Sequence, residues 1–193
     1  MGNCLSQITI RKLIKISKLS LRTRQILNGF VIVFSVILCL VILPTRLSGM
    51  EIFGFSPNWL LIWVVTWSIK RSPVQGAFAG LVLGLIQDGM TSPHPSHTIS
   101  LMLVGFLSAR IQKQRFIQED FISIALIVFG MAIVGETITA VQYILQGDRT
   151  WAEIWIDYQL IALASAIVSS LWAPVVYYPL NRWWVQMNLL QQS

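Results

Sequence analysis

Two carboxylic acids, Asp88 and Glu136, stand inside long apolar runs of the sequence. A carboxylate near the centre of a bilayer costs roughly 2.5–3.5 kcal/mol on insertion scales, so such a residue is expected to face protein or water. We expect Glu136 to face the interior of a helix bundle, to be protonated or hydrogen-bonded, and to help hold the central helices together. The alternative is a proton relay, for which Asp88 is the candidate second group.

Metal binding and covalent catalysis are not favoured by the sequence. His94 and His97 stand close together among prolines, but zinc sites in proteins use three or four ligands, and Asp88 is the nearest acid. The sequence has no G-x-S-x-G, no H-E-x-x-H and no P-loop lysine motif. We therefore predict no catalytic residue, no metal site and no cofactor, and we expect that the chain is not an enzyme.

Glycines recur at every fourth position of the apolar run that ends near Asp88. Residues with this spacing share one face of a helix, and small residues there let two helix backbones approach closely in a membrane. The stripe therefore predicts either packing against another helix of the same chain or a groove for the transmembrane helix of another protein. We assign the following residues to partner-helix packing: Gly76, Gly80, Gly84, Trp59 and Trp63.

The elements that carry these residues are expected to be membrane-spanning helices. The chain has 193 residues, of which 55% are hydrophobic and only 11% are charged, with a mean hydropathy of +0.68. This is too little charge for a soluble surface, and the fold class predicted is an all-α polytopic membrane helix bundle. About six spans are expected, with short or broken middle spans, or five if the middle pair is re-entrant. The expected spans are 27–43, 52–69, 74–90, 98–110, 121–145 and 158–179.

The basic residues predict how the chain lies in the membrane. With the N-terminus in the cytoplasm, only Arg46 and Arg149 of the 14 Lys and Arg residues fall outside, which leaves twelve inside. This asymmetry favours the bacterial inner membrane with both termini cytoplasmic. No basic face is interleaved with aromatics, so nucleic acid is not an expected partner. The predicted organisation is a basic amphipathic segment (1–25), one transmembrane domain (26–181) and a cytoplasmic tail (182–193).

One stretch of the sequence, PNWLLIWVVTWSIKRSPVQGAFAGLVLGLIQDGMTSP, has a recognisable pattern. Residues 57–61 open a short span with Pro, a polar residue and Trp-Leu-Leu, and Gly80, Gly84 and Asp88 form a glycine-rich span that ends in an acid. These motifs resemble the rod shape-determining membrane protein MreD family. Glu136 stands where members of this family often carry an acid in the next long span.

The resemblance implies a non-enzymatic part of the cell-elongation machinery. Members associate with MreC, a single-span protein, and work with MreB filaments and with the polymerase and transpeptidase that synthesise the peptidoglycan wall. The resemblance also implies a fold similar to the substrate-binding subunits of vitamin transporters, so a small-molecule transporter or its substrate-binding subunit is the alternative function. Pro95-Ser96 departs from the Leu-Gly often found there, and the long basic N-terminus resembles a cyanobacterial variant.

Overall fold

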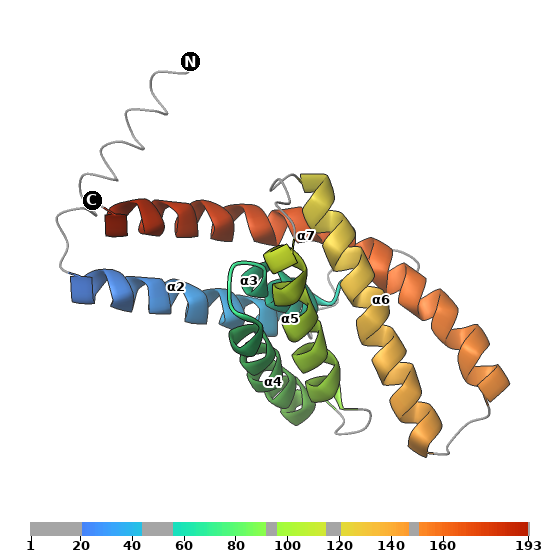
Figure 1. The fold of residues 1–193 in the computed structure, drawn as a ribbon. Helices are drawn as coiled ribbons and strands as arrows, with labels where there is room; N and C mark the ends of the chain where they lie inside the picture. The colour runs from blue at the N-terminus through green and yellow to red at the C-terminus, as the bar shows by residue number, and fades with distance from the viewer. Residues whose placement is uncertain (1–20, 44–55, 92–95, 115–120, 147–150, 193) are drawn as a thin grey trace. The chain divides into compact units, whose positions relative to one another are not determined.

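The structure is a computed structural model that describes residues 21–43, 56–91, 96–114, 121–146 and 151–192. Contacts divide the chain into two compact units, residues 1–38 with 178–193 and residues 39–177. The described residues form six α-helices and no strand (Figure 1). These helices are α2 (Leu21–Ile42), α3 (Trp59–Ser68), α4 (Pro73–Met90), α5 (His97–Gln114), α6 (Phe121–Gln146) and α7 (Trp151–Gln192).

The predicted all-α polytopic membrane bundle is confirmed. Three helices are long and apolar enough to cross a bilayer, namely Arg22–Ile42, Phe121–Gln146 and Tyr158–Met187. Large apolar side chains on α4, α6 and α7 are exposed, for example Phe78, Leu126 and Leu171. Apolar surface of this extent is costly in water but is matched by lipid. Most of the predicted amphipathic segment, together with Arg46, His94 and Arg149, lies outside the described residues.

Helix α3 is the short middle element that the sequence predicts. Its 10 residues would rise only about 15 Å, half of a hydrocarbon core. Eight consecutive residues, 59–66, are buried, so α3 is covered by protein on all sides. Trp59 is buried against Trp172 of α7, with ring centroids 5.5 Å apart. A helix too short to span is therefore kept away from lipid by the other helices of its unit.

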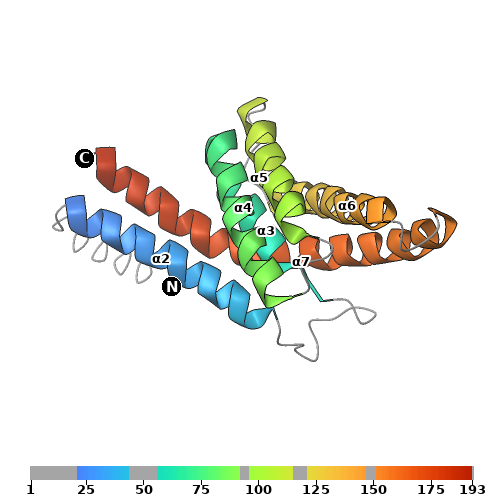
Figure 2. The ribbon, with the colours of Figure 1, turned by 90° about the horizontal axis from the view of Figure 1, so that it is seen from below.

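Helices α4 and α5 form a tight antiparallel hairpin, and they lie side by side in both Figure 1 and Figure 2. Helix α4 begins with a capping box, in which the Ser72 hydroxyl accepts from the Gln75 amide and the Gln75 side chain accepts from the Ser72 amide. Pro73 occupies the first turn, where its missing N–H costs nothing. These signals start the helix sharply and leave its glycine face free to meet α5.

Helix α7 differs from the sixth predicted span, which was expected to end at Pro179. The helix is continuous over 42 residues, from Trp151 to Gln192, and passes through both Pro174 and Pro179. Proline removes one backbone hydrogen bond but does not have to end a helix in a membrane protein, where local adjustments satisfy the freed carbonyl. The helix therefore continues beyond the predicted end of the span, and residues 182–192 of the predicted tail are helical.

The smaller unit contains most of α2 and the last turns of α7. Within it, the indole nitrogen of Trp183 donates to the side-chain oxygen of Asn28, 3.4 Å away. Phe30 and Phe34 stack on the apolar surface of α2 and are both more than half exposed. This surface is suited to contact with lipid.

Candidate functional site

The glycine face of α4 packs directly on the backbone of α5. A Cβ atom at Gly80 would lie 2.5 Å from the carbonyl carbon of Leu101, and one at Gly76 would lie 3.0 Å from that of Gly105. At Gly84, a Cβ would lie 2.9 Å from the amide nitrogen of Thr98. Side-chain carbons are almost never so close to backbone, so only glycine fits at these positions of α4.

Of the two roles predicted for the glycine stripe, packing within the chain is the one observed. The face of α4 that carries Gly76, Gly80 and Gly84 is covered by α5, and Trp59 and Trp63 are buried. Gly105 on α5 contributes to the same contact from the opposite side. The assignment of these residues to a partner helix stays a prediction.

Asp88 caps the first turn of α5 from the last turn of α4. Its two carboxylate oxygens accept hydrogen bonds from the backbone amides of His97 and Thr98 at 2.7 and 3.2 Å, and from the hydroxyls of Ser96 and Thr98 at 2.8 and 2.7 Å. The Nδ1 atom of His97 lies 3.0 Å from the same carboxylate. The first amides of a helix have no partner inside the helix and carry positive potential, so a carboxylate stabilises them well.

Gln142 of α6 holds the same turn from a second direction. Its side-chain oxygen accepts from the Ser96 amide at 2.8 Å, and its side-chain nitrogen donates to the Ser96 carbonyl at 3.0 Å. This pair of bonds imitates the pairing between two backbone segments. Two turns before Gln142 on α6, the carbonyl of Gly135 accepts a hydrogen bond from the Ser100 hydroxyl at 3.0 Å. Together these contacts fix the hairpin against α6.

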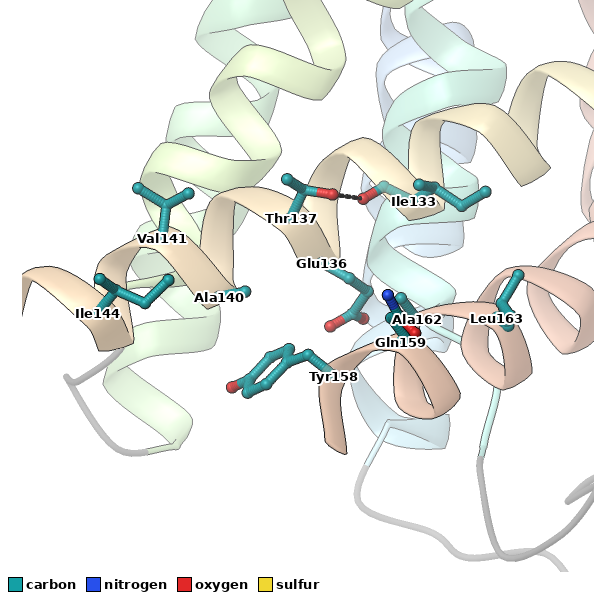
Figure 3. Close-up of a pocket in the computed structure, with 10 residues that line it drawn as sticks. All are labelled: Ile133, Glu136, Thr137, Ala140, Val141, Ile144, Tyr158, Gln159, Ala162 and Leu163. Carbon is teal, nitrogen blue, oxygen red and sulfur yellow. Dashed lines mark hydrogen bonds between the residues drawn. The ribbon is translucent and has the colours of Figure 1, made fainter. Parts of the chain in front are cut away.

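Glu136 points from α6 into the space between α6 and α7 (Figure 3). Its carboxyl group accepts a hydrogen bond from the Ser165 hydroxyl of α7 at 3.3 Å. This is close to the upper limit for such a bond. Glu136 therefore lies between two helices, and a role in holding the central helices together stays a prediction.

Glu136 also lines three hollows of the larger unit. A small polar cavity of about 60 Å³ lies toward His97, Ser100 and Thr139. A second polar pocket of about 310 Å³ lies toward Ser56 and Ser165. An apolar cleft of about 370 Å³ separates α6 from α7. Asn58 and Gln87 line both polar hollows. Because Glu136 lines these hollows and the apolar cleft, its carboxyl group stands where polar and apolar space meet.

The comparison with known families identifies the family of this chain. A model of the rod shape-determining protein MreD family matches residues 22–179. The chain belongs to the MreD family. No curated protein and no solved structure matches the chain, so a likeness of this MreD chain to vitamin-transporter subunits stays a prediction. Membership supports a role in rod-shape determination.

The structure brings together only some of the residues expected to act in this MreD chain. Asp88 and Glu136 do not contact each other, because Asp88 is turned toward the start of α5 while Glu136 faces α7. Sequence reasoning missed Gln142 and Gly135, although a glutamine inside an apolar helix is a usable signal for a buried polar contact. Among the described residues, no group of three or more His, Cys, Asp or Glu could hold a metal.

Replacing Gln142 with leucine is expected to loosen the turn before α5. The substitution removes two hydrogen bonds to Ser96 and leaves its part-buried backbone groups without these partners, at a cost of about 1–3 kcal/mol. The free energy of unfolding, measured in mixed detergent micelles, checks this. Thr137→Val is the control, because the Thr137 hydroxyl bonds only within its own helix. Equal stability of the two variants would contradict a structural role for Gln142.

Proposed function

We propose that this chain is a non-enzymatic scaffold in the membrane part of the cell-elongation machinery. It would bind an MreC-type single-span protein, help position the wall polymerase and transpeptidase, and act with MreB filaments indirectly. The observation that carries the proposal is the family match over residues 22–179. The proposed location is the bacterial inner membrane, with both termini in the cytoplasm.

The use of the polar and small residues supports a scaffold. Gly76, Gly80 and Gly84 hold two helices at close distance, and Asp88 accepts hydrogen bonds that fix a helix start. These contacts build a stiff hairpin, and stiff secondary structure positions a binding surface better than loops do. Since Trp59 and Trp63 are covered by the chain's own helices, we propose that the predicted residues shape the surface a partner helix meets.

A cell-shape assay tests the proposed function. In a rod-shaped bacterium depleted of its own family member, expression of this chain together with its MreC partner should restore rods. A photocrosslinking amino acid at Phe78, on the outer side of α4, should capture MreC. The same group at Leu126 of α6 is the matched control, because the two side chains are 67% and 68% exposed. Round cells despite correct insertion of both proteins, or equal crosslinking at both positions, would contradict the proposal.

The alternative function, a substrate-binding membrane subunit of a transporter, has one specific observation in its favour. The polar pocket of about 310 Å³ beside Asn58, Gln87 and Glu136 lies at the lower end of the size range of small-molecule sites. Asp88 caps α5 and lines none of the three hollows. Loss of uptake of a small molecule on depletion, with rod shape retained, would favour this alternative over the scaffold.

A further inference from the structure

Gln87 of α4 presents an unused hydrogen-bond acceptor to the interior. The residue is only 6% exposed, and its side-chain oxygen has no hydrogen-bond partner among the described residues. Gln87 lines both polar hollows, the cavity of about 60 Å³ and the pocket of about 310 Å³. Buried polar atoms are nearly always paired, and an exception inside a cavity indicates that something else supplies the partner.

Glu136 adds a second acceptor to the same two hollows. The one donor that reaches its carboxyl group within the described residues is the Ser165 hydroxyl, at the long distance of 3.3 Å. A carboxylate at membrane depth is stable only when cations or several donors surround it. The two hollows are therefore lined by an unpaired amide oxygen of Gln87 and by a carboxyl group of Glu136 that accepts one long hydrogen bond. A matching guest would carry several N–H groups and a positive charge.

The apolar cleft determines what the rest of the guest would be. Most of the residues that line the cleft between α6 and α7 are aliphatic, and Figure 3 shows Glu136 among them. The cleft of about 370 Å³ is too large to be explained by one or two ordered waters, each of which occupies about 30 Å³. An apolar cleft with the carboxyl group of Glu136 in its wall is complementary to an amphiphile, which has an apolar chain and a polar head.

We propose that Gln87 and Glu136 form a binding site for the primary ammonium head of an amphiphile, whose apolar chain lies in the cleft between α6 and α7. The ammonium group donates to the Gln87 oxygen and to the Glu136 carboxylate. Its three N–H donors match the unused acceptors. The head could belong to a free long-chain amine or to an ethanolamine lipid, and both present the same group. This site does not depend on the scaffold role, which concerns the outer side of α4 around Phe78 and cell shape.

The test uses the full chain in nanodiscs made of choline phospholipid. Hexylammonium chloride is the probe. Hexan-1-ol, which has the same chain without the charge, is the control compound. Hexylammonium should raise the thermal unfolding midpoint in a saturable way, because a ligand that binds only the folded state stabilises it. Glu136→Gln should weaken hexylammonium binding by about tenfold or more, since a charge-assisted bond is lost, and leave hexan-1-ol unaffected. Ser170→Ala is the control, because Ser170 lines none of the three hollows and its hydroxyl bonds to the Ile167 carbonyl of its own helix, so this variant should bind both as the parent does.

Gln87→Met supplies a second readout that does not depend on how Glu136→Gln folds. With no ligand present, this variant should unfold at a higher temperature than the parent, because the unpaired buried oxygen is gone. It should also bind hexylammonium more weakly. A purely structural Gln87 would instead make the variant less stable.

Two outcomes would overturn the site. One is equal binding of hexylammonium and hexan-1-ol, and the other is unchanged hexylammonium binding in Glu136→Gln. If hexylammonium binding is shown to depend on Glu136, nanodiscs of ethanolamine phospholipid then test whether the natural ammonium group belongs to a lipid or to a free amine. Greater stability there than in choline discs assigns it to a lipid, and equal stability assigns it to a free amine.

Discussion

Gly80→Leu is expected to prevent the α4–α5 hairpin from closing and to leave little folded protein in the membrane. A Cβ at this position would lie 2.5 Å from the Leu101 carbonyl carbon and 2.8 Å from the Met102 amide nitrogen. Backbone atoms in the middle of a helix cannot move aside as a flexible side chain can. Overpacking of a well-packed core lowers the free energy of unfolding by about 1–3 kcal/mol. A clash with backbone atoms is expected to cost at least as much as the top of that range. Unfolding in mixed detergent micelles measures the loss.

Gly89→Leu is the matched control for this prediction. Gly89 stands on the same helix, and a Cβ there would have nothing within 4 Å. The leucine side chain would point into open space, and leucine has a higher helix propensity than glycine. Gly89→Leu should therefore keep or slightly raise the stability of the protein. If both variants unfolded alike, the effect would come from added bulk in α4 and not from its contact with α5.

Asp88→Ala is expected to lower the free energy of unfolding by about 3 kcal/mol, the second large effect. The change removes the acceptor of four hydrogen bonds from Ser96, His97 and Thr98. Each part-buried donor that loses its partner costs about 1–3 kcal/mol, and solvent that enters repays a share. Hydrogen exchange at the amides of His97 and Thr98 should speed up before exchange in the rest of α5. Asp88→Asn keeps one acceptor oxygen and should fall between the parent and Asp88→Ala.

The opposite end of α4 supplies the control for Asp88. Ser72→Ala removes a capping hydroxyl that is exposed and bonds only to Gln75. Loss of such a cap costs about 1 kcal/mol, and it should leave exchange in α5 unchanged. If Asp88→Ala were no more harmful than Ser72→Ala, the carboxylate would not be needed for the start of α5.

The sequence alone was sufficient to predict the class of fold and the places where helices form. Apolar runs of the length that crosses a bilayer have no other stable structure there than a helix. Helix α6 lies within one residue of its predicted bounds, and α2 ends one residue before its predicted end but begins six residues earlier than predicted. The interruption at Pro57-Asn58 predicted a short second helix, and α3 begins at Trp59. The spacing of Gly76, Gly80 and Gly84 predicted a close helix contact, because a period of four places residues on one helix face.

The end of α7 could not be predicted in the same way. Pro179 is a plausible stop in isolation, but the helix continues to Gln192. A proline weakens a helix locally by a fixed amount. Whether the helix ends there depends on the contacts of the residues that follow, such as the bond from Trp183 to Asn28. Those contacts join positions far apart in the chain, so a local sequence pattern does not predict them.

The tertiary structure alone decided what the acids and the glycines contact. Spacing along a helix determines which residues share a face but carries no information about the element that will cover it. The alternative of a proton relay needed Asp88 as the second group beside Glu136, yet Asp88 caps α5, while Glu136 faces α7. Gln142 acts on a turn 46 residues away in the sequence. Hydrogen bonds are short-ranged and directional, so their partners are known only once the helices have been brought together.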